Sequence, residues 1–166
     1  METGKGSSNT TMERTSEREL VITRTVNGPA RLVFEAWTTP ELFIRWWVPK
    51  SFNLKVLSFD ADIRTGGHYR IVFAHGEGEM AFFGKYLEVT PHSRVVWTNE
   101  ESGDAGPIST VTLEDRGEKT LQVLHELYPT KEALDAAMTS GEKDGMEETF
   151  TQLEEVVEGL GATVAQ

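Results

Sequence analysis

Asp62-Ile63-Arg64-Thr65-Gly66-Gly67-His68-Tyr69-Arg70 is the stretch of this sequence that best indicates the fold. Paired glycines permit backbone angles that are closed to other residues, so the chain can reverse sharply at Gly66 and Gly67. The corner leads directly into residues that favour extended structure. It therefore predicts the entry to a strand, and this strand belongs to a longer series.

That series occupies most of the middle of the chain. Six runs of extended-favouring residues lie near 52–60, 67–75, 79–89, 93–100, 107–115 and 119–127. The connections between them are short, which forces neighbouring strands to be antiparallel because a parallel pair needs a crossover of a dozen residues or more. With a further β-branched run at 19–26, the sequence predicts an antiparallel sheet of about seven strands.

Helices are predicted on both sides of this series, which makes the fold class α+β. Pro29 suits the first turn of a helix that reaches Trp37, and Thr39-Pro40-Glu41 predicts a second short helix to about Trp46. Thr130 caps another short helix that extends to Met138. A long C-terminal helix carries an apolar stripe at spacings of four, three, four and three: Met146, Phe150, Leu153, Val157 and Leu160. Only the sheet is large enough to bury that stripe.

Length and composition predict one domain over residues 18–166, preceded by a polar, disordered tail at 1–17. The chain has no cysteine, which excludes disulfides, thiolate catalysis and cysteine-bound metals and fits a cytoplasmic setting. No apolar run approaches the ~20 residues that span a bilayer.

The formal net charge is -11, and much of it lies near the C-terminus. Between Glu126 and Glu158 there are ten acidic residues and two lysines. Such a surface repels phosphate backbones and anionic headgroups, so neither nucleic acid nor a membrane is expected as a partner. The acidic segment is either a solvated helix face or a docking face for a basic partner, and the sequence leaves both open.

The predicted elements raise the question of a cavity. Seven strands at ~4.8 Å spacing give a sheet on the order of 34 Å wide, whereas one helix with its side chains is roughly 10 to 12 Å across. One helix cannot cover such a sheet. The remaining inner surface is either filled by large side chains and the two short helices or left as a cavity.

Five segments in this order resemble one known superfamily. They are Pro29 to Trp37, residues 39–42 with Trp46-Trp47, residues 62–70, Gly84 to Pro91, and Gly145 to Leu153. On these segments the chain is identified as a member of the START-like (SRPBCC, birch-pollen-allergen-like) superfamily. The branch is similar to the C-terminal domain of the activator of heat shock protein 90 ATPase. The resemblance covers roughly residues 19–160. It implies a helix-grip fold, in which a curved antiparallel sheet wraps a long C-terminal helix and leaves an apolar pocket between them.

Alternation along two strands suggests pocket residues. It places Tyr69, Ile71, Phe73 and His75 on one face of the run at 67–75, and Leu121, Val123, His125 and Leu127 on one face of the run at 119–127. In a pocket, His75 and His125 would orient a polar ligand group or shuttle protons near neutral pH. The alternative is that both rings are hydrogen-bonded or solvated at strand ends.

The resemblance adds further wall residues, with ordinary core packing as the alternative at each position. The complete predicted pocket comprises Tyr69, Ile71, Phe73, His75, Phe82, Tyr86, Trp97, Val123, His125, Met146, Phe150 and Leu153.

The sequence contains no HExxH motif, no calcium loop and no Gly-x-Ser-x-Gly elbow, so we expect no metal, no cofactor and no serine nucleophile. The expected function is binding of a small apolar or aromatic ligand without catalysis. Two alternatives stay open: an enzyme similar to polyketide cyclases or aromatases that uses pocket acid and base groups, and a chaperone ATPase regulator that acts through its surface. A homodimer and a chaperone partner are likewise left open.

Overall fold

The computed structural model describes residues 10–101, 106–140 and 144–164. Its elements in chain order are β2 (Thr10–Arg14), β3 (Glu19–Val26), α1 (Ala30–Thr38), α2 (Pro40–Trp46), the 3-10 helix η1 (Lys50–Phe52), β4 (Val56–Ala61), β5 (His68–His75), β6 (Gly78–Thr90), β7 (Arg94–Thr98), β8 (Ile108–Asp115), β9 (Thr120–Leu127), α3 (Lys131–Thr139) and α4 (Met146–Val164).

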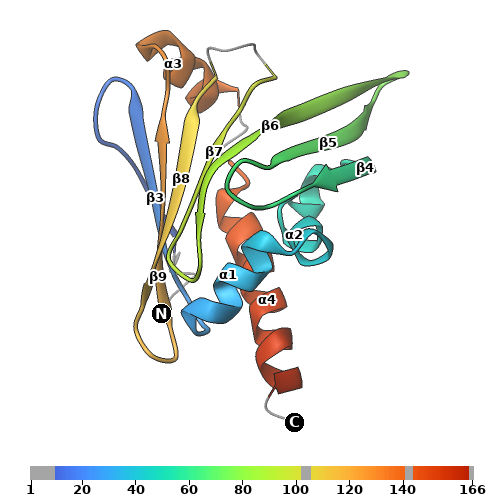
Figure 1. Ribbon diagram of the computed structural model, residues 1–166. Helices are drawn as coiled ribbons and strands as arrows, with labels where there is room; N and C mark the ends of the chain where they lie inside the picture. Colours follow the sequence, from blue (N-terminus) through green and yellow to red (C-terminus); the bar gives the residue numbers. More distant parts are fainter. Residues whose placement is uncertain (1–9, 102–105, 141–143, 165–166) are drawn as a thin grey trace, which may run out of the picture.

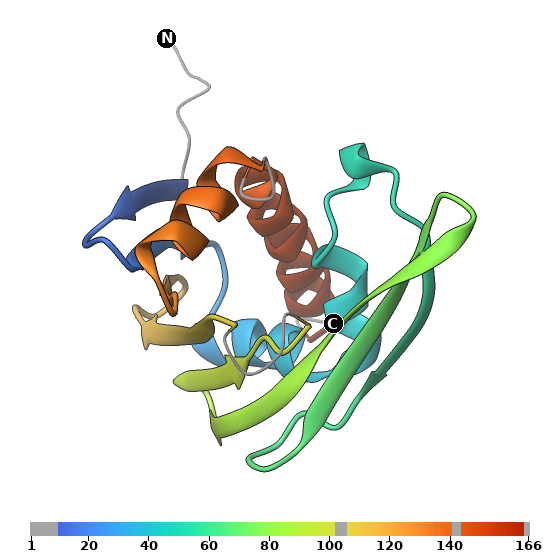
Figure 2. The same cartoon turned by 90° about the horizontal axis from the view of Figure 1, so that it is seen from above.

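The strands form one eight-stranded sheet in the order β2-β3-β9-β8-β7-β6-β5-β4, and every neighbouring pair is antiparallel. The sheet bends into an arc with α4 inside it, which is plain when the molecule is seen from above (Figure 2). Helices α1 and α2 pack against α4, and α1 also contacts β8 while α2 contacts β4 (Figure 1). The predicted α+β, helix-grip architecture is confirmed.

Strand β2 is the one strand among the described residues that the sequence did not predict. It lies in the segment 1–17 that was expected to be disordered, and residues 10–14 pair with β3 from Thr10 opposite Arg24 to Arg14 opposite Leu20. The prediction is wrong for these residues because the free edge of β3 supplies backbone partners that local composition does not reveal. Residues 1–9 lie outside the described part of the chain.

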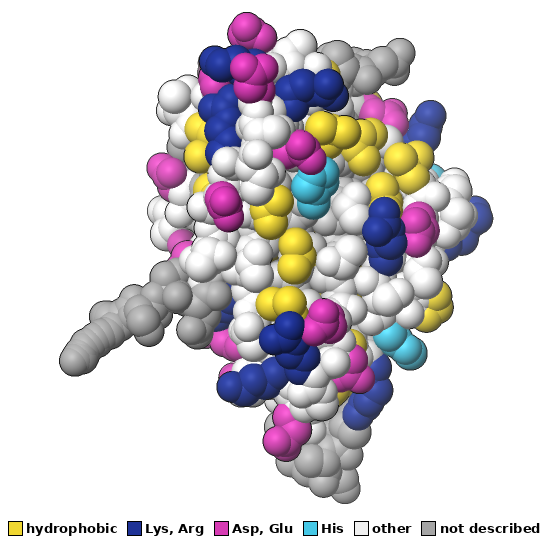
Figure 3. All heavy atoms as spheres, turned by 90° about the vertical axis from the view of Figure 1, so that its left-hand side faces the viewer, with side chains coloured by type: hydrophobic (Ala, Val, Ile, Leu, Met, Phe, Trp, Pro, Cys, Tyr) yellow, Lys and Arg dark blue, Asp and Glu magenta, His cyan; other side chains and the backbone are white. Residues whose placement is uncertain are grey.

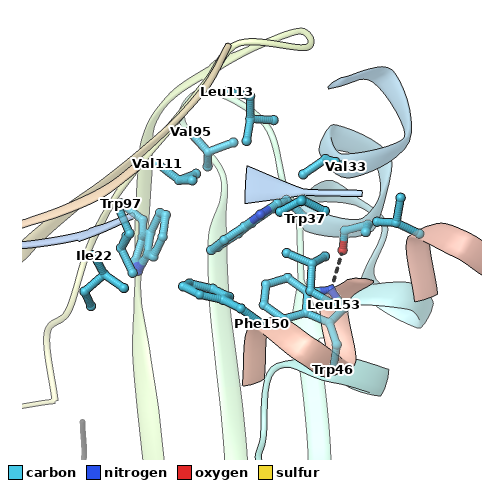
Figure 4. Packing of buried hydrophobic residues seen from close by; sticks show 14 of the residues in the cluster. Ile22, Val33, Trp37, Trp46, Val95, Trp97, Val111, Leu113, Phe150 and Leu153 are labelled. Atoms are coloured by element: carbon cyan, nitrogen blue, oxygen red, sulfur yellow. Dashed lines mark hydrogen bonds between the residues drawn. The ribbon is translucent and has the colours of Figure 1, made fainter. Parts of the chain in front are cut away.

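The predicted apolar stripe of α4 packs on the sheet. Phe150, Leu153 and Val157 are at most 1% exposed. Figure 4 shows Phe150 and Leu153 among side chains of the sheet, α1 and α2. In the same cluster the indole Nε1 of Trp46 donates to the carbonyl oxygen of Ala36 at 3.0 Å, which fastens α2 to α1.

One buried cation explains part of the acidity of α4. Arg24, on the inner face of β3, is 2% exposed, and its guanidinium lies 2.8 Å from Glu147 and 3.0 Å from Glu154. A buried guanidinium has to be paired with carboxylates, because desolvating it alone is costly. These two glutamates therefore hold α4 to β3 rather than only solvating the helix.

Candidate ligand-binding cavity

A cavity of about 540 Å³ lies between the inner face of the sheet, the α2–β4 connection and the N-terminal end of α4. Its wall is dominated by aromatic rings: Trp37, Phe43, Trp47, Phe52, Phe59, Tyr69, Phe73, Phe82, Tyr86, Trp97 and Tyr128. Phe52 and Leu54 line it and are also 41% and 36% exposed, so the cavity reaches solvent at this connection. A volume of this size is typical of sites for small organic molecules.

The glycine corner positions one of these rings. The amide N–H of Gly66 donates to the carbonyl oxygen of Tyr86 at 2.9 Å, and the N–H of Tyr86 donates to the carbonyl oxygen of Gly67 at 3.0 Å. Gly66 has a φ of 88°, and a Cβ on Gly67 would lie 1.8 Å from the carbonyl oxygen of Asp62. Only glycine fits this corner. The corner thus fixes the backbone of β6 at the point where Tyr86 enters the cavity wall.

Two cavity tyrosines are held in their neutral form. Burial raises the pKa of Tyr86 above its ordinary value. Burial also raises the pKa of Tyr69, and the negative charge of Glu101 adds to the effect. The Tyr69 hydroxyl donates to the carbonyl oxygen of Thr98 at 2.8 Å. Both hydroxyl groups therefore remain hydrogen-bond donors throughout the physiological pH range.

A chain of polar side chains crosses the cavity wall and ends at a carboxylate. The Tyr69 hydroxyl lies 3.3 Å from the Oδ1 of Asn99, and the Nδ2 of Asn99 donates to the Oγ of Ser109 at 3.1 Å. Ser109 donates in turn to the Oε2 of Glu126 at 3.5 Å, and the Tyr128 hydroxyl donates to Oε1 of Glu126 at 2.9 Å. Glu126 is only 7% exposed. The otherwise apolar cavity thus has one wall that accepts hydrogen bonds.

Residues 47–54 form another wall, and α4 holds them in place. Gln152 donates to the carbonyl oxygens of Trp46 and Val48 at 3.0 and 2.9 Å and accepts from the N–H of Lys50 at 2.9 Å. Glu148 accepts from the hydroxyl and N–H of Ser51, and these bonds lower the pKa of Glu148. Gln152 is 6% exposed, so its three hydrogen bonds to the backbone of residues 46–50 are shielded from water, unlike those of Glu148.

Replacing Gln152 by methionine is expected to destabilise the protein by about 1 to 3 kcal/mol. The change keeps the side-chain length but leaves buried carbonyl groups at positions 46 and 48 without a donor, and each such loss costs on this order. Urea unfolding monitored by tryptophan fluorescence measures the effect. Glu155→Met, at an exposed position of the same helix, is the control and should change the free energy of unfolding by less than ~0.5 kcal/mol. Equal effects for the two variants would contradict the role of Gln152.

The structure separates the predicted pocket residues into two groups. Seven lie in the cavity wall: Tyr69, Ile71, Phe73, Phe82, Tyr86, Trp97 and Met146. Five lie elsewhere: His75, Val123, His125, Phe150 and Leu153. Of these five, Phe150 and Leu153 belong to the solid core between α4 and the sheet, where both are 0% exposed.

For β9, the sequence predicted the wrong face of the strand to point inward. The buried positions are Thr120, Gln122, Leu124 and Glu126, so Val123 and His125 point to the opposite, outer face of the sheet. The polar residues turn inward because each has a partner there. Thr120 donates to the carbonyl oxygen of Gly28, and Gln122 accepts from the indole of Trp37 at 2.8 Å. The apolar residues of the outer face, such as Val123, are half-buried by side chains of neighbouring strands, so their exposure to water costs little.

Neither candidate histidine lies in the cavity wall. His75 is exposed at the end of β5, beyond the last cavity residue of that strand, Phe73. His125 lies on the outer face with its Nε2 2.9 Å from a carboxylate oxygen of Glu19. Figure 3 views the molecule from the side of β3, where hydrophobic side chains alternate with charged ones. The histidines thus occupy the hydrogen-bonded or solvated positions that were the alternative expectation.

Sequence reasoning missed the polar residues of the cavity, among them Asn99, Ser109, Glu126 and Tyr128. One signal was present: Gln122 and Glu126 alternate with Leu124 on one face of a predicted strand, and such a face is amphipathic rather than simply solvent-exposed. In the described part of the chain, no group of three or more His, Asp or Glu side chains is placed to hold a metal ion. No helix within the described ranges is long and apolar enough to span a membrane.

Comparison with known proteins agrees with this architecture. Residues 27–158 match the family described as Activator of Hsp90 ATPase homolog 1-like protein, which is most of the chain. The chain belongs to this family. This family, called AHSA1-like below, is the predicted branch of the START-like superfamily, so the predicted membership is confirmed. No curated protein matches the sequence.

Solved structures share the same fold. A Nitrosomonas europaea protein is 27% identical with a TM-score of 0.78, and the match covers 90% of this chain and 99% of that one. A Chromobacterium violaceum protein is 29% identical with a TM-score of 0.68, over 84% and 97% of the two chains. A Staphylococcus aureus protein described as of unknown function shares the fold at 19% identity, with a TM-score of 0.67 over 95% and 98% of the chains. These solved structures share the fold of this chain and carry no ligand assignment.

Proposed function

We propose that this AHSA1-like domain binds a small hydrophobic, ring-containing molecule in the cavity between its sheet and α4. The observation that carries the proposal is the 540 Å³ volume enclosed largely by aromatic side chains. Rings at this density offer apolar area and edge or face contacts to a second ring. Trp37, for example, already lies within 5.5 Å of Trp97 and 5.8 Å of Trp47, measured between ring centroids.

The shape of the wall supports binding rather than a collapsed core. The cavity residues are held by elements that are fixed independently of it: the glycine corner fixes Tyr86, and Gln152 of α4 fixes residues 46–50. A preformed site loses little conformational entropy when it binds its ligand. Phe52 and Leu54 at the solvent end provide the route of entry.

A thermal-shift panel of two- and three-ring aromatic compounds tests this proposal. A compound present at 100 times its Kd is expected to raise Tm by about 5 to 10 °C, because binding to the folded state adds ~2.7 kcal/mol to its stability. Met146→Trp should abolish the shift, since residue 146 lines the cavity and the larger indole occupies it. Met138→Trp is the matched control, because Met138 is 38% exposed on α3 and lies outside the wall.

Two results would contradict ligand binding in this cavity. One is the absence of any shift across the panel in the unsubstituted protein. The other is a set of shifts that Met146→Trp and Met138→Trp change equally, which would place binding outside this cavity. For a compound that does give a shift, isothermal titration against all three proteins measures how much affinity each substitution removes.

The alternative functions receive less support. An acid–base mechanism through His75 and His125 would need rings that face the cavity, and neither does. Regulation of a chaperone ATPase stays an expectation from the family resemblance, since no particular surface feature of the described residues favours it.

A further inference from the structure

We infer that the cavity selects ring-containing ligands that carry a hydrogen-bond acceptor such as a carbonyl oxygen, and that the hydroxyl of Tyr86 donates to this acceptor. This inference rests on the proposed function and specifies the polar group of its ligand. The two cavity tyrosines differ in their hydrogen bonding. The Tyr69 hydroxyl donates to the carbonyl oxygen of Thr98 at 2.8 Å, whereas the Tyr86 hydroxyl has no hydrogen-bond partner among the described residues.

The unpaired hydroxyl of Tyr86 is accessible from the cavity. Tyr86 lines the cavity and is only 6% exposed. In the described part of the chain, the side-chain polar atoms that are both fully enclosed and unpartnered are the Nε of Arg24 and the Nε2 of Gln122. The Tyr86 oxygen is not one of them, so part of its surface stays open to the cavity that the ring lines. A largely buried hydroxyl without a partner is unfavourable, and a bound acceptor would remove that cost.

The donors at this point of the wall favour a ligand that accepts hydrogen bonds. Burial raises the pKa of Tyr86, so its phenol keeps its proton at physiological pH. Trp97 pairs with Tyr86 across β6 and β7 and also lines the cavity, and its indole N–H has no partner within the described ranges either. An indole N–H can only donate. A ligand group that only donates would therefore leave both of these protons unpaired, whereas an acceptor can pair with them.

The register of the sheet places the Tyr86 donor beside an aromatic surface on which a ligand ring can pack. Neighbouring strands lie ~4.8 Å apart, so the side chains of Tyr86 and Trp97 are adjacent in the wall. The Trp97 ring in turn lies 5.5 Å from Trp37 and 6.4 Å from Trp47, measured between ring centroids. A ligand ring that packs on Trp97 thus lies next to Tyr86, and an acceptor attached to the edge of that ring is within reach of the hydroxyl.

Two probes of the same shape isolate the effect of the acceptor. The ketone 2-acetylnaphthalene carries a carbonyl oxygen, and 2-isopropenylnaphthalene has a methylene group in its place. Equilibrium dialysis gives the Kd of both. Tyr86→Phe is expected to weaken binding of the ketone about tenfold and to change binding of the hydrocarbon by less than about twofold, because only the ketone loses a hydrogen bond.

Tyr69→Phe is the matched control. It removes the same group from the same wall, with ring centroids 5.7 Å apart, but this hydroxyl already has a partner in the protein. It should change the ratio of the two affinities by less than about twofold. The ligand-free proteins give a second contrast: Tyr69→Phe should lower Tm, whereas Tyr86→Phe should not, because it breaks no hydrogen bond within the protein. An equal loss of Tm in the two variants would show that Tyr86 is already paired and would overturn the inference.

The infrared stretching frequency of the bound carbonyl gives a readout that does not depend on affinity and needs no variant. A hydrogen bond lowers this frequency. We expect isotope-labelled 2-acetylnaphthalene to absorb at lower frequency in the unsubstituted protein than in hexane, and Tyr86→Phe to remove most of the difference while Tyr69→Phe keeps it.

The outcomes separate this inference from the function on which it rests. Three results would overturn the role of Tyr86 while leaving hydrophobic binding intact: a ratio of affinities that Tyr86→Phe leaves unchanged, a change in that ratio that Tyr69→Phe produces equally, or a bound carbonyl that absorbs as it does in hexane. Failure of both probes to bind would overturn both proposals.

Discussion

A chain truncated after Gly145 is expected to lose its cooperative unfolding transition and to aggregate. The truncation removes α4 and with it Phe150, Leu153 and Val157, which are the buried residues that close the concave side of the sheet. Each such side chain contributes roughly 1.5 to 3 kcal/mol by burial, and the net stability of a domain is only about 5 to 15 kcal/mol. The loss also removes Glu147 and Glu154, the two carboxylates that pair with Arg24.

Size-exclusion chromatography and near-ultraviolet circular dichroism on the truncated and full chains measure this result. Retained far-ultraviolet signal with lost near-ultraviolet signal would indicate a molten sheet, as expected when packing is lost but strand pairing persists. A truncated chain that stays monomeric and melts sharply would contradict the helix-grip packing described above.

Phe150→Ala is expected to destabilise the protein by about 3 to 5 kcal/mol, because the ring is 0% exposed and lies in the solid core rather than in the cavity wall. Its ring centroid is 6.4 Å from that of Trp46, so the substitution leaves a void that α2 cannot easily fill. Denaturant unfolding gives the free-energy difference. The surface control Leu87→Ala, at a position 50% exposed on β6, should cost less than ~1 kcal/mol. A loss below ~1 kcal/mol for Phe150→Ala would mean that the ring borders open space.

The order and type of most elements could be predicted from local signals. The glycine corner, the short turns and the helix stripe each depend on a few neighbouring residues, and the structure has them within a few positions of the predicted bounds. The main shift occurs at β4, which begins at Val56 rather than near 52. Lys50 to Phe52 form a 3-10 turn instead, and Asn53 closes it with a φ of 54°.

The parts that failed depend on partners distant in sequence. Strand β2 exists because β3 offers it an edge, and no feature of residues 10–14 alone predicts that edge. The inward face of β9 depends on Trp37 and Tyr128, which donate hydrogen bonds to Oε1 of Gln122 and Oε1 of Glu126. Whether the space beside α4 is filled or open depends on how the side chains of many elements pack together, and strand alternation carries no information on volume.

The pairing of β3 with β9 has a consequence for how the protein is made. Glu19 lies opposite Leu127 and Val26 opposite Thr120, so about a hundred residues separate the two strands in the chain. On the ribosome, β3 therefore emerges together with β2 but long before β9 exists, and Leu20 and Ile22 lack their β9 neighbours Glu126 and Leu124 for that time. Translation must deliver residues 120–127 before β2 and β3 can join the rest of the sheet through β9, and α4 follows only afterwards. The chain thus completes its fold after nearly all of it has been synthesised, and the nascent protein exposes a strand edge for most of that time.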